Sequence, residues 1–81
     1  MEIVIGPLTE NSEGSFFTQN WYKEDTGPSG IRVLFKQDCI TGLCSVSLVS
    51  GDEDSLEVRE TREGLTVDQA REEIERLIGI L

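Results

Sequence analysis

The chain has 81 residues, with sixteen acidic and seven basic side chains, no histidine and a formal net charge of −9. This charge argues against direct binding to nucleic acid or to an anionic membrane, because both surfaces require clustered lysine and arginine. A chain this short forms one domain with a thin core, and it has no apolar run near the ~20 residues of a membrane span, so we expect residues 1–81 to be a single small acidic domain in the cytoplasm.

The N-terminal part of the chain predicts two strands separated by a loop. Met1, Ile3 and Ile5 alternate with other residues and share one side of a first short strand. Residues 9–15 are polar and contain a glycine, which is typical of a loop. Residues 16–23 (FFTQNWYK) are rich in aromatic side chains, which favours a second strand.

Three strands with a clearer alternation follow residues 24–30 (EDTGPSG), the strongest breaker in the sequence because proline fixes φ and glycine permits positive φ. Short connections between neighbouring strands require antiparallel pairing, so residues 31–60 should form a β-meander. The residues predicted to face inward are Ile31, Val33 and Phe35 in the first strand, Cys44, Val46 and Leu48 in the second, and Leu56 and Val58 in the third.

Residues 65–81 predict one amphipathic helix. Thr66 is the expected N-cap, and Gln69 completes a capping box with it. Glu72 and Arg76 have the spacing of an i,i+4 ion pair. The apolar residues that share one helical face are Val67, Ala70, Ile74, Leu77, Ile78 and Leu81.

Together these elements predict an α+β fold. A lone helix cannot bury its own apolar stripe, so the strands must provide the surface that covers it. We expect a four- or five-stranded antiparallel sheet, a β-meander, with one C-terminal α-helix packed on one face.

The two cysteines, Cys39 and Cys44, are separated by four residues within a predicted hairpin. Three interpretations fit this spacing: unpaired thiols in a reducing cytosol, a hairpin disulfide, or a reactive or metal-binding pair. Zinc normally takes four ligands, so a metal site would need a second subunit in a chain without histidine. We expect no cofactor and no metal, and keep a thiol-based redox or metal module on Cys39 and Cys44 as an alternative function.

The absence of histidine also bears on catalysis. It removes the commonest general base near neutral pH and the nucleophiles that depend on imidazole. Paired carboxylates remain available for acid–base chemistry, but a sheet with one helix has little interior to bury a substrate. We therefore expect a protein that is not an enzyme and has no catalytic residues.

Acidic residues begin the breaker at residues 24–30 and are dense around the last predicted turn. One interpretation is a solvated surface that keeps the protein soluble. The other is a docking surface for a basic protein, because a negative field speeds encounter with such a partner. The candidate contacts are Glu24, Asp25, Asp52, Glu53, Asp54, Glu57 and Glu60.

Four of the five aromatic residues lie within residues 16–22. Adjacent residues of a strand point to opposite faces, so Phe16 and Phe17 cannot both enter one core unless the strand is bulged. Exposed Trp21 and Tyr22 would make good interface anchors. The alternative is that they fill the core or cover the second face of the sheet.

These features favour a non-catalytic protein–protein interaction module. In charge and size the chain resembles the small nucleic-acid mimics that phages use against restriction or CRISPR effectors, a likeness of composition alone. The likeness implies an inhibitor that docks a basic protein, such as a nucleic-acid-binding enzyme, with carboxylates in place of phosphates. A structural subunit of a homodimer or larger homo-oligomer is a further alternative, because a thin core favours association.

Overall fold

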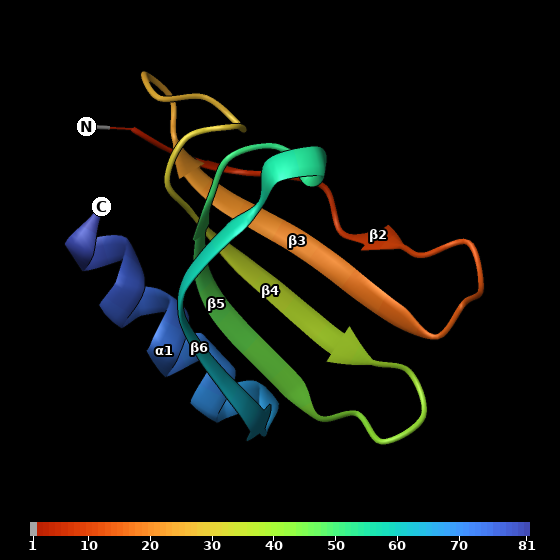
Figure 1. Cartoon of the computed structure of the whole chain (residues 1–81). Helices are drawn as coiled ribbons and strands as arrows, with labels where there is room; N and C mark the ends of the chain where they lie inside the picture. Colours follow the sequence, from red (N-terminus) through yellow and green to blue (C-terminus); the bar gives the residue numbers. More distant parts are fainter. Residues whose placement is uncertain (1) are drawn as a thin grey trace.

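The computed structural model describes residues 2–81, so the predicted place of Met1 in the first strand lies outside the described residues. An open antiparallel sheet carries a single C-terminal helix on one face, which confirms the predicted α+β fold (Figure 1). The elements are β1 (Ile3–Ile5), β2 (Thr9–Glu10), β3 (Phe16–Lys23), β4 (Arg32–Asp38), β5 (Cys44–Ser50), the 3₁₀ turn η1 (Glu53–Ser55), β6 (Glu57–Leu65) and α1 (Val67–Ile80).

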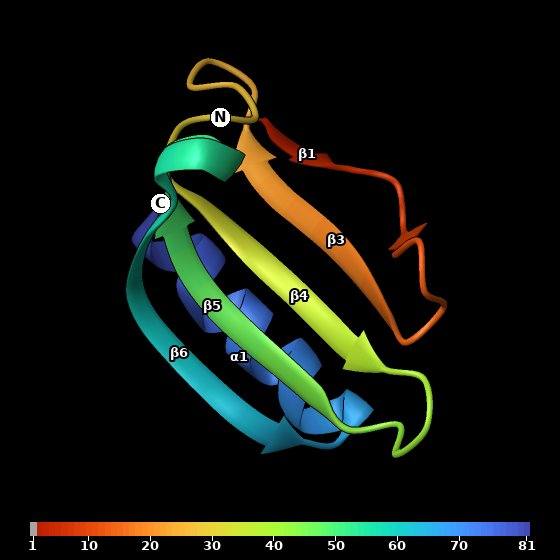
Figure 2. The ribbon, with the colours of Figure 1, turned by 45° about the vertical axis from the view of Figure 1, so that its right-hand side comes forward.

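The strands follow one another across the sheet in the order β1-β3-β4-β5-β6, and every pair is antiparallel. Figure 2 shows β1 beside β3 toward one edge and β6 at the other. The predicted meander is therefore confirmed. The segment predicted as a loop contains the two-residue strand β2, which pairs with β3 through Thr9–Thr18 and Glu10–Phe17. Two residues are too few to produce an alternating pattern.

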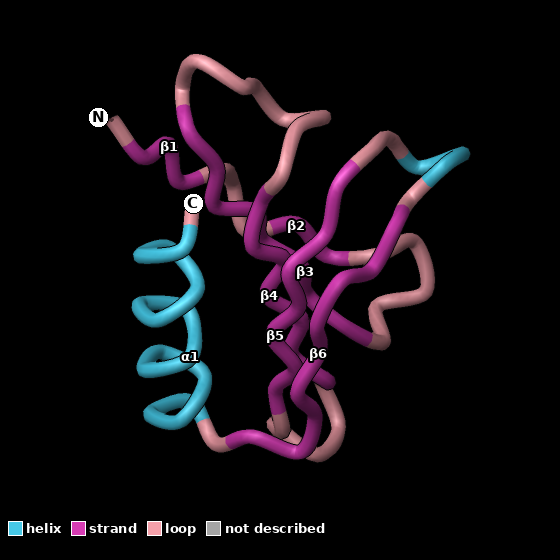
Figure 3. The backbone as a smooth tube through the Cα atoms, turned by 60° about the vertical axis from the view of Figure 1, so that its left-hand side comes forward, coloured by secondary structure: helices cyan, strands magenta, loops and turns pink. Residues whose placement is uncertain are grey.

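The core lies between the sheet and α1, which form two layers (Figure 3). Val33 is opposite Leu48 and Phe35 is opposite Val46, so these four side chains share the face that carries the helix. Burial of each large aliphatic side chain stabilises the fold by roughly 1.5–3 kcal/mol. The buried cluster consists of Val33, Cys44, Val46, Leu48, Ala70, Ile74 and Leu77.

The predicted start of the helix is confirmed. The Gln69 N–H donates to Thr66 Oγ1 at 3.2 Å, and the Thr66 N–H donates to Gln69 Oε1 at 3.0 Å, which completes the capping box. The predicted Glu72–Arg76 ion pair is wrong. Arg76 instead contacts Glu73 and Glu60, because it points toward β6, where Glu60 supplies a second carboxylate.

The predicted inward orientation of Leu56 and Val58 is also wrong, since these side chains are 41% and 55% exposed. The pairing of β5 with β6 shifts register between Leu48 and Val49. Such an irregularity moves a side chain to the other face of a sheet. Val58 is consequently opposite Val49, on the face without the helix.

Candidate functional site

Five of the predicted contact residues lie at one end of the sheet. The β3–β4 and β5–β6 connections both reach this end, because each antiparallel hairpin returns the chain to it (Figure 1). All five carboxylates are exposed. Glu53 belongs to η1, but its side chain lies outside the described part of the chain. We call the following set the acidic end: Glu24, Asp25, Asp52, Asp54 and Glu57.

Arg32, the first residue of β4, joins the two acidic connections. Its Nη1 donates to the carbonyl of Gly30 at 3.1 Å and to the carbonyl of Gly51 at 2.7 Å. Its Nε donates to Asn20 Oδ1 at 3.2 Å. Among the described residues no carboxylate forms an ion pair with Arg32, although the residue is only 7% exposed. Carbonyl dipoles therefore compensate this buried cation.

Local backbone geometry holds the second connection close to the first. The Gly51 N–H donates to the carbonyl of Ser29 at 3.1 Å. Gly51 has φ +87°, and a Cβ at this position would meet the carbonyl oxygen of Ser55 at 2.5 Å. Glycine is therefore required here both by the left-handed backbone and by the close approach of the chain.

Asp52 caps the 3₁₀ turn that follows. Its Oδ1 accepts hydrogen bonds from the Ser55 hydroxyl at 2.8 Å and from the Ser55 N–H at 3.0 Å. These hydrogen bonds to the ionised form lower the pKa of Asp52 below its ordinary value. Asp52 is thus charged at neutral pH and fixed in orientation.

Glu60 lies apart from the acidic end. It is opposite Leu48, on the helix-bearing face, and its carboxylate contacts the Arg76 guanidinium. Glu73 lies between Arg76 and Arg62, with Arg62 Nε at 3.4 Å from Glu73 Oε1. Four charges therefore form a chain from β6 to α1 and back, which spacing along the sequence did not indicate.

Trp21 and Tyr22 point to opposite faces of β3. Trp21 is opposite Val33 and packs against the buried cluster, whereas Tyr22 is opposite Arg32 on the face without the helix. Of these two aromatic residues, only Tyr22 lies on the same face and at the same end of the sheet as Arg32. The structure thus places Tyr22, and not Trp21, beside the acidic end.

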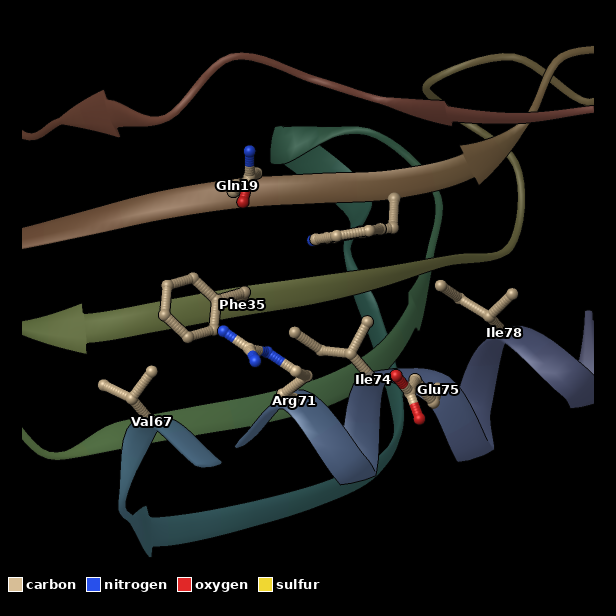
Figure 4. Close-up of a pocket in the computed structure, with 8 residues that line it drawn as sticks. Gln19, Phe35, Val67, Arg71, Ile74, Glu75 and Ile78 are labelled. Carbon is tan, nitrogen blue, oxygen red and sulfur yellow. The ribbon is translucent and has the colours of Figure 1, made fainter. Parts of the chain in front are cut away.

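Trp21 instead lines a groove of about 390 Å³ between α1 and the sheet. Its indole Nε1 is buried and has no hydrogen-bond partner among residues 2–81. Figure 4 shows Phe35 on the floor of the groove, Arg71 and Glu75 on the helix, and Gln19 on β3. Sequence patterns gave no sign of this groove, because it exists only once α1 is placed over β4 and β5 rather than over β3.

Cys39 and Cys44 are both free, Cys39 exposed and Cys44 buried. Partial desolvation by the surrounding chain raises the pKa of both thiols, even that of the exposed Cys39, whose pKa the carboxylates of Glu10 and Asp38 raise further. A raised pKa leaves little of the reactive thiolate at neutral pH. The surroundings of the two thiols therefore do not favour a redox pair, and the side chains that the structure describes, Glu53 excepted, contain no group of three or more potential metal ligands.

Within the described residues, no helix has the length and apolar character needed to cross a membrane. The chain matches no family model, no curated protein and no solved structure.

Proposed function

We propose that this protein is a non-catalytic binding protein whose acidic end docks a basic surface of another protein. The observation that carries the proposal is the pair of hydrogen bonds by which Arg32 holds two connections side by side. The β3–β4 connection bears Glu24 and Asp25. The β5–β6 connection bears Asp52 and Asp54. Connections joined in this way lose less backbone freedom on binding than independent loops do.

The charge balance at the acidic end supports a basic partner. Arg32 is buried and its Nη1 and Nε hydrogen bonds are made to oxygens of its own chain, so this guanidinium is not presented to a partner, whereas the carboxylates are. Tyr22 lies beside this end and offers an aromatic ring with a polar tip. Anionic groups with an adjacent aromatic contact are suited to an arginine-rich surface, because guanidinium groups both pair with carboxylates and stack on rings.

A basic surface of this kind is typical of proteins that bind nucleic acid. In that case the acidic end would compete with phosphates, and the protein would act as an inhibitor by nucleic-acid mimicry. We place this activity in the cytoplasm on account of the two free cysteines, since reducing compartments keep thiols unpaired.

A pair of charge reversals tests the proposal. Asp25→Lys with Asp54→Lys changes one carboxylate in each connection, and neither side chain forms an ion pair within the described residues. We expect the affinity for a synthetic oligoarginine peptide, measured by calorimetry at low salt, to fall by at least about tenfold, equivalent to about 1.4 kcal/mol.

The matched control is Glu13→Lys with Glu72→Lys, which changes net charge equally at exposed positions on other elements. We expect the control to lose no more than about threefold in affinity for the same peptide, because charges far from the acidic end act on the peptide only through the screened electrostatic field of the whole protein. Equal losses in the two double variants would reject the acidic end as the binding surface. A wild-type protein that also binds duplex DNA under these conditions would contradict the proposed mode of recognition.

A further inference from the structure

β6 forms one edge of the sheet. In the described part of the chain it pairs with β5 on one side and with no strand on the other (Figure 2). Its nine residues are exposed except for Glu60 and Leu65, which are partly shielded. Unpaired N–H and C=O groups along such an edge can pair with a further strand.

The sequence of β6, EVRETREGL, is self-complementary in charge about Thr61. When two copies of β6 run antiparallel with Thr61 opposite Thr61, Glu60 faces the partner's Arg62. A twofold axis repeats this pair, so Glu60 and Arg62 of each copy meet an opposite charge, the arrangement that stabilises neighbouring strands.

Contacts within one copy lead to the same two positions. The chain of ion pairs described above runs from Arg62 through Glu73 and Arg76 to Glu60, so its free ends are Arg62 and Glu60. These two side chains are 60% and 39% exposed, which leaves each surface for a further partner. Joining both ends to a second copy closes the chain into a ring of eight charges that alternate in sign.

We propose that two copies of this chain associate through β6 as a twofold-symmetric antiparallel pair. The two sheets then become one continuous sheet, and both helices lie on the same face, because the twofold axis is perpendicular to the plane of the sheet. Of the acidic end only Glu57 belongs to β6, and it lies outside the centre of the strand, where residues 60–62 would form the contact. The inference is therefore independent of the proposed function, and either can fail without the other.

The irregular pairing of β6 with β5 limits how many backbone hydrogen bonds two copies can form. The register shifts of β6 against β5 fall on either side of residues 60–62. Irregularities of this kind bend and twist a strand, so regular pairing is confined to the centre of β6. The charged pairs rather than a long ladder of backbone hydrogen bonds then determine the affinity.

Charge reversals at Glu60 and Arg62 test the register, because these two positions face each other across the twofold axis. Arg62→Glu places two glutamates opposite each other twice, and Glu60→Arg does the same with arginines. Each change also removes an ion pair within its own copy, which mixing the two variants does not restore. We expect sedimentation equilibrium to show a wild-type dimer and, for each variant, a dimer dissociation constant raised by at least about tenfold, since like charges directly opposite destabilise paired strands.

Mixing supplies the decisive measurement. Arg62→Glu paired with Glu60→Arg restores opposite charges at both positions, so an equimolar mixture should form a heterodimer with affinity within about threefold of wild type. The double variant Glu60→Arg/Arg62→Glu should regain the homodimer for the same reason. Circular dichroism of each variant confirms that the fold is intact, which keeps a loss of association separate from a loss of structure.

The matched controls are Arg71→Glu and Glu75→Arg, the same charge changes on the flank of α1 that lines the groove away from β6. These variants should leave the dissociation constant unchanged. A wild-type protein that is monomeric up to its solubility limit would overturn the proposal. So would a dimer that is insensitive to both β6 variants, or two monomeric variants that stay monomeric when mixed.

Discussion

Arg32 and Gly51, nineteen positions apart in the chain, are joined by a hydrogen bond of 2.7 Å from the guanidinium Nη1 to the carbonyl oxygen. Because the arginine is buried, this bond is shielded from competing water and ties the start of β4 to the turn that follows β5. The acidic end thus depends on a cation that is not itself part of the exposed surface.

Replacing Arg32 by methionine should destabilise the protein. The change leaves the carbonyls of Gly30 and Gly51 without this donor, and each buried unsatisfied group costs about 1–3 kcal/mol. We expect urea denaturation to show a loss of about 2–4 kcal/mol. Arg71→Met, at an exposed position, is the control and should change stability by less than about 0.5 kcal/mol. A similar small change at Arg32 would refute its role as a clamp.

Truncation of Leu77 tests the packing of α1 on the sheet. This side chain is fully buried, and its replacement by alanine should cost about 2–5 kcal/mol through lost burial and the cavity left behind. Ile80→Ala lies three residues farther along the same helix at an exposed position and should cost less than about 1 kcal/mol. Thermal denaturation of the two variants checks the difference, and comparable losses would mean that α1 is not docked as described.

Glu73 should make stability depend on acidity. Hydrogen bonding to Arg76, followed by the positive charges of Arg76 and Arg62, lowers the pKa of this carboxyl below its ordinary value of 4.5. The stabilisation is therefore complete above the unfolded pKa and is lost as pH falls through the lower, folded pKa. Urea denaturation between about pH 6 and pH 2 should show a smaller loss of stability in Glu73→Gln than in wild type. Glu75→Gln is the control and should follow the wild-type curve.

The two cysteines should differ in reactivity. Cys39 is exposed and Cys44 is buried, so a thiol reagent added at alkaline pH, where the thiolate forms, should modify Cys39 in the native protein and Cys44 only after denaturation. Cys39→Ser should abolish the fast phase, and Cys44→Ser should leave it. Two equally slow thiols, or no free thiol in the denatured and unreduced protein, would contradict this assignment.

Elements with a regular local pattern could be predicted from the sequence. The helix with its Thr66 cap, the strand at residues 16–23 and the alternation of Cys44, Val46 and Leu48 all rest on spacing within one segment. Val58 was misplaced because its face depends on a register shift against β5, which involves two segments at once. The same holds for Arg76, whose partner Glu60 lies sixteen residues away on another element.

In the candidate site, too, the features that depend on one segment could be predicted and those that depend on two segments could not. Composition identifies the carboxylates, but only the topology shows that Glu24 and Asp25 share an end with Asp52 and Asp54 while Glu60 does not. The clamp at Arg32 gives no signal in the sequence, since an arginine at the start of a strand is expected to be solvated. The groove beside Trp21 likewise requires the position of α1, which no periodicity specifies.

Trp21, the single tryptophan of the chain, packs at the seam between β3 and α1, against the buried cluster. Its intrinsic fluorescence therefore reports whether α1 is packed on the sheet. Lifting α1 would hydrate the indole and shift its emission to longer wavelength even with every strand still in register. A shift that precedes the loss of the circular dichroism signal of the sheet would therefore distinguish partial opening from global unfolding without an attached dye.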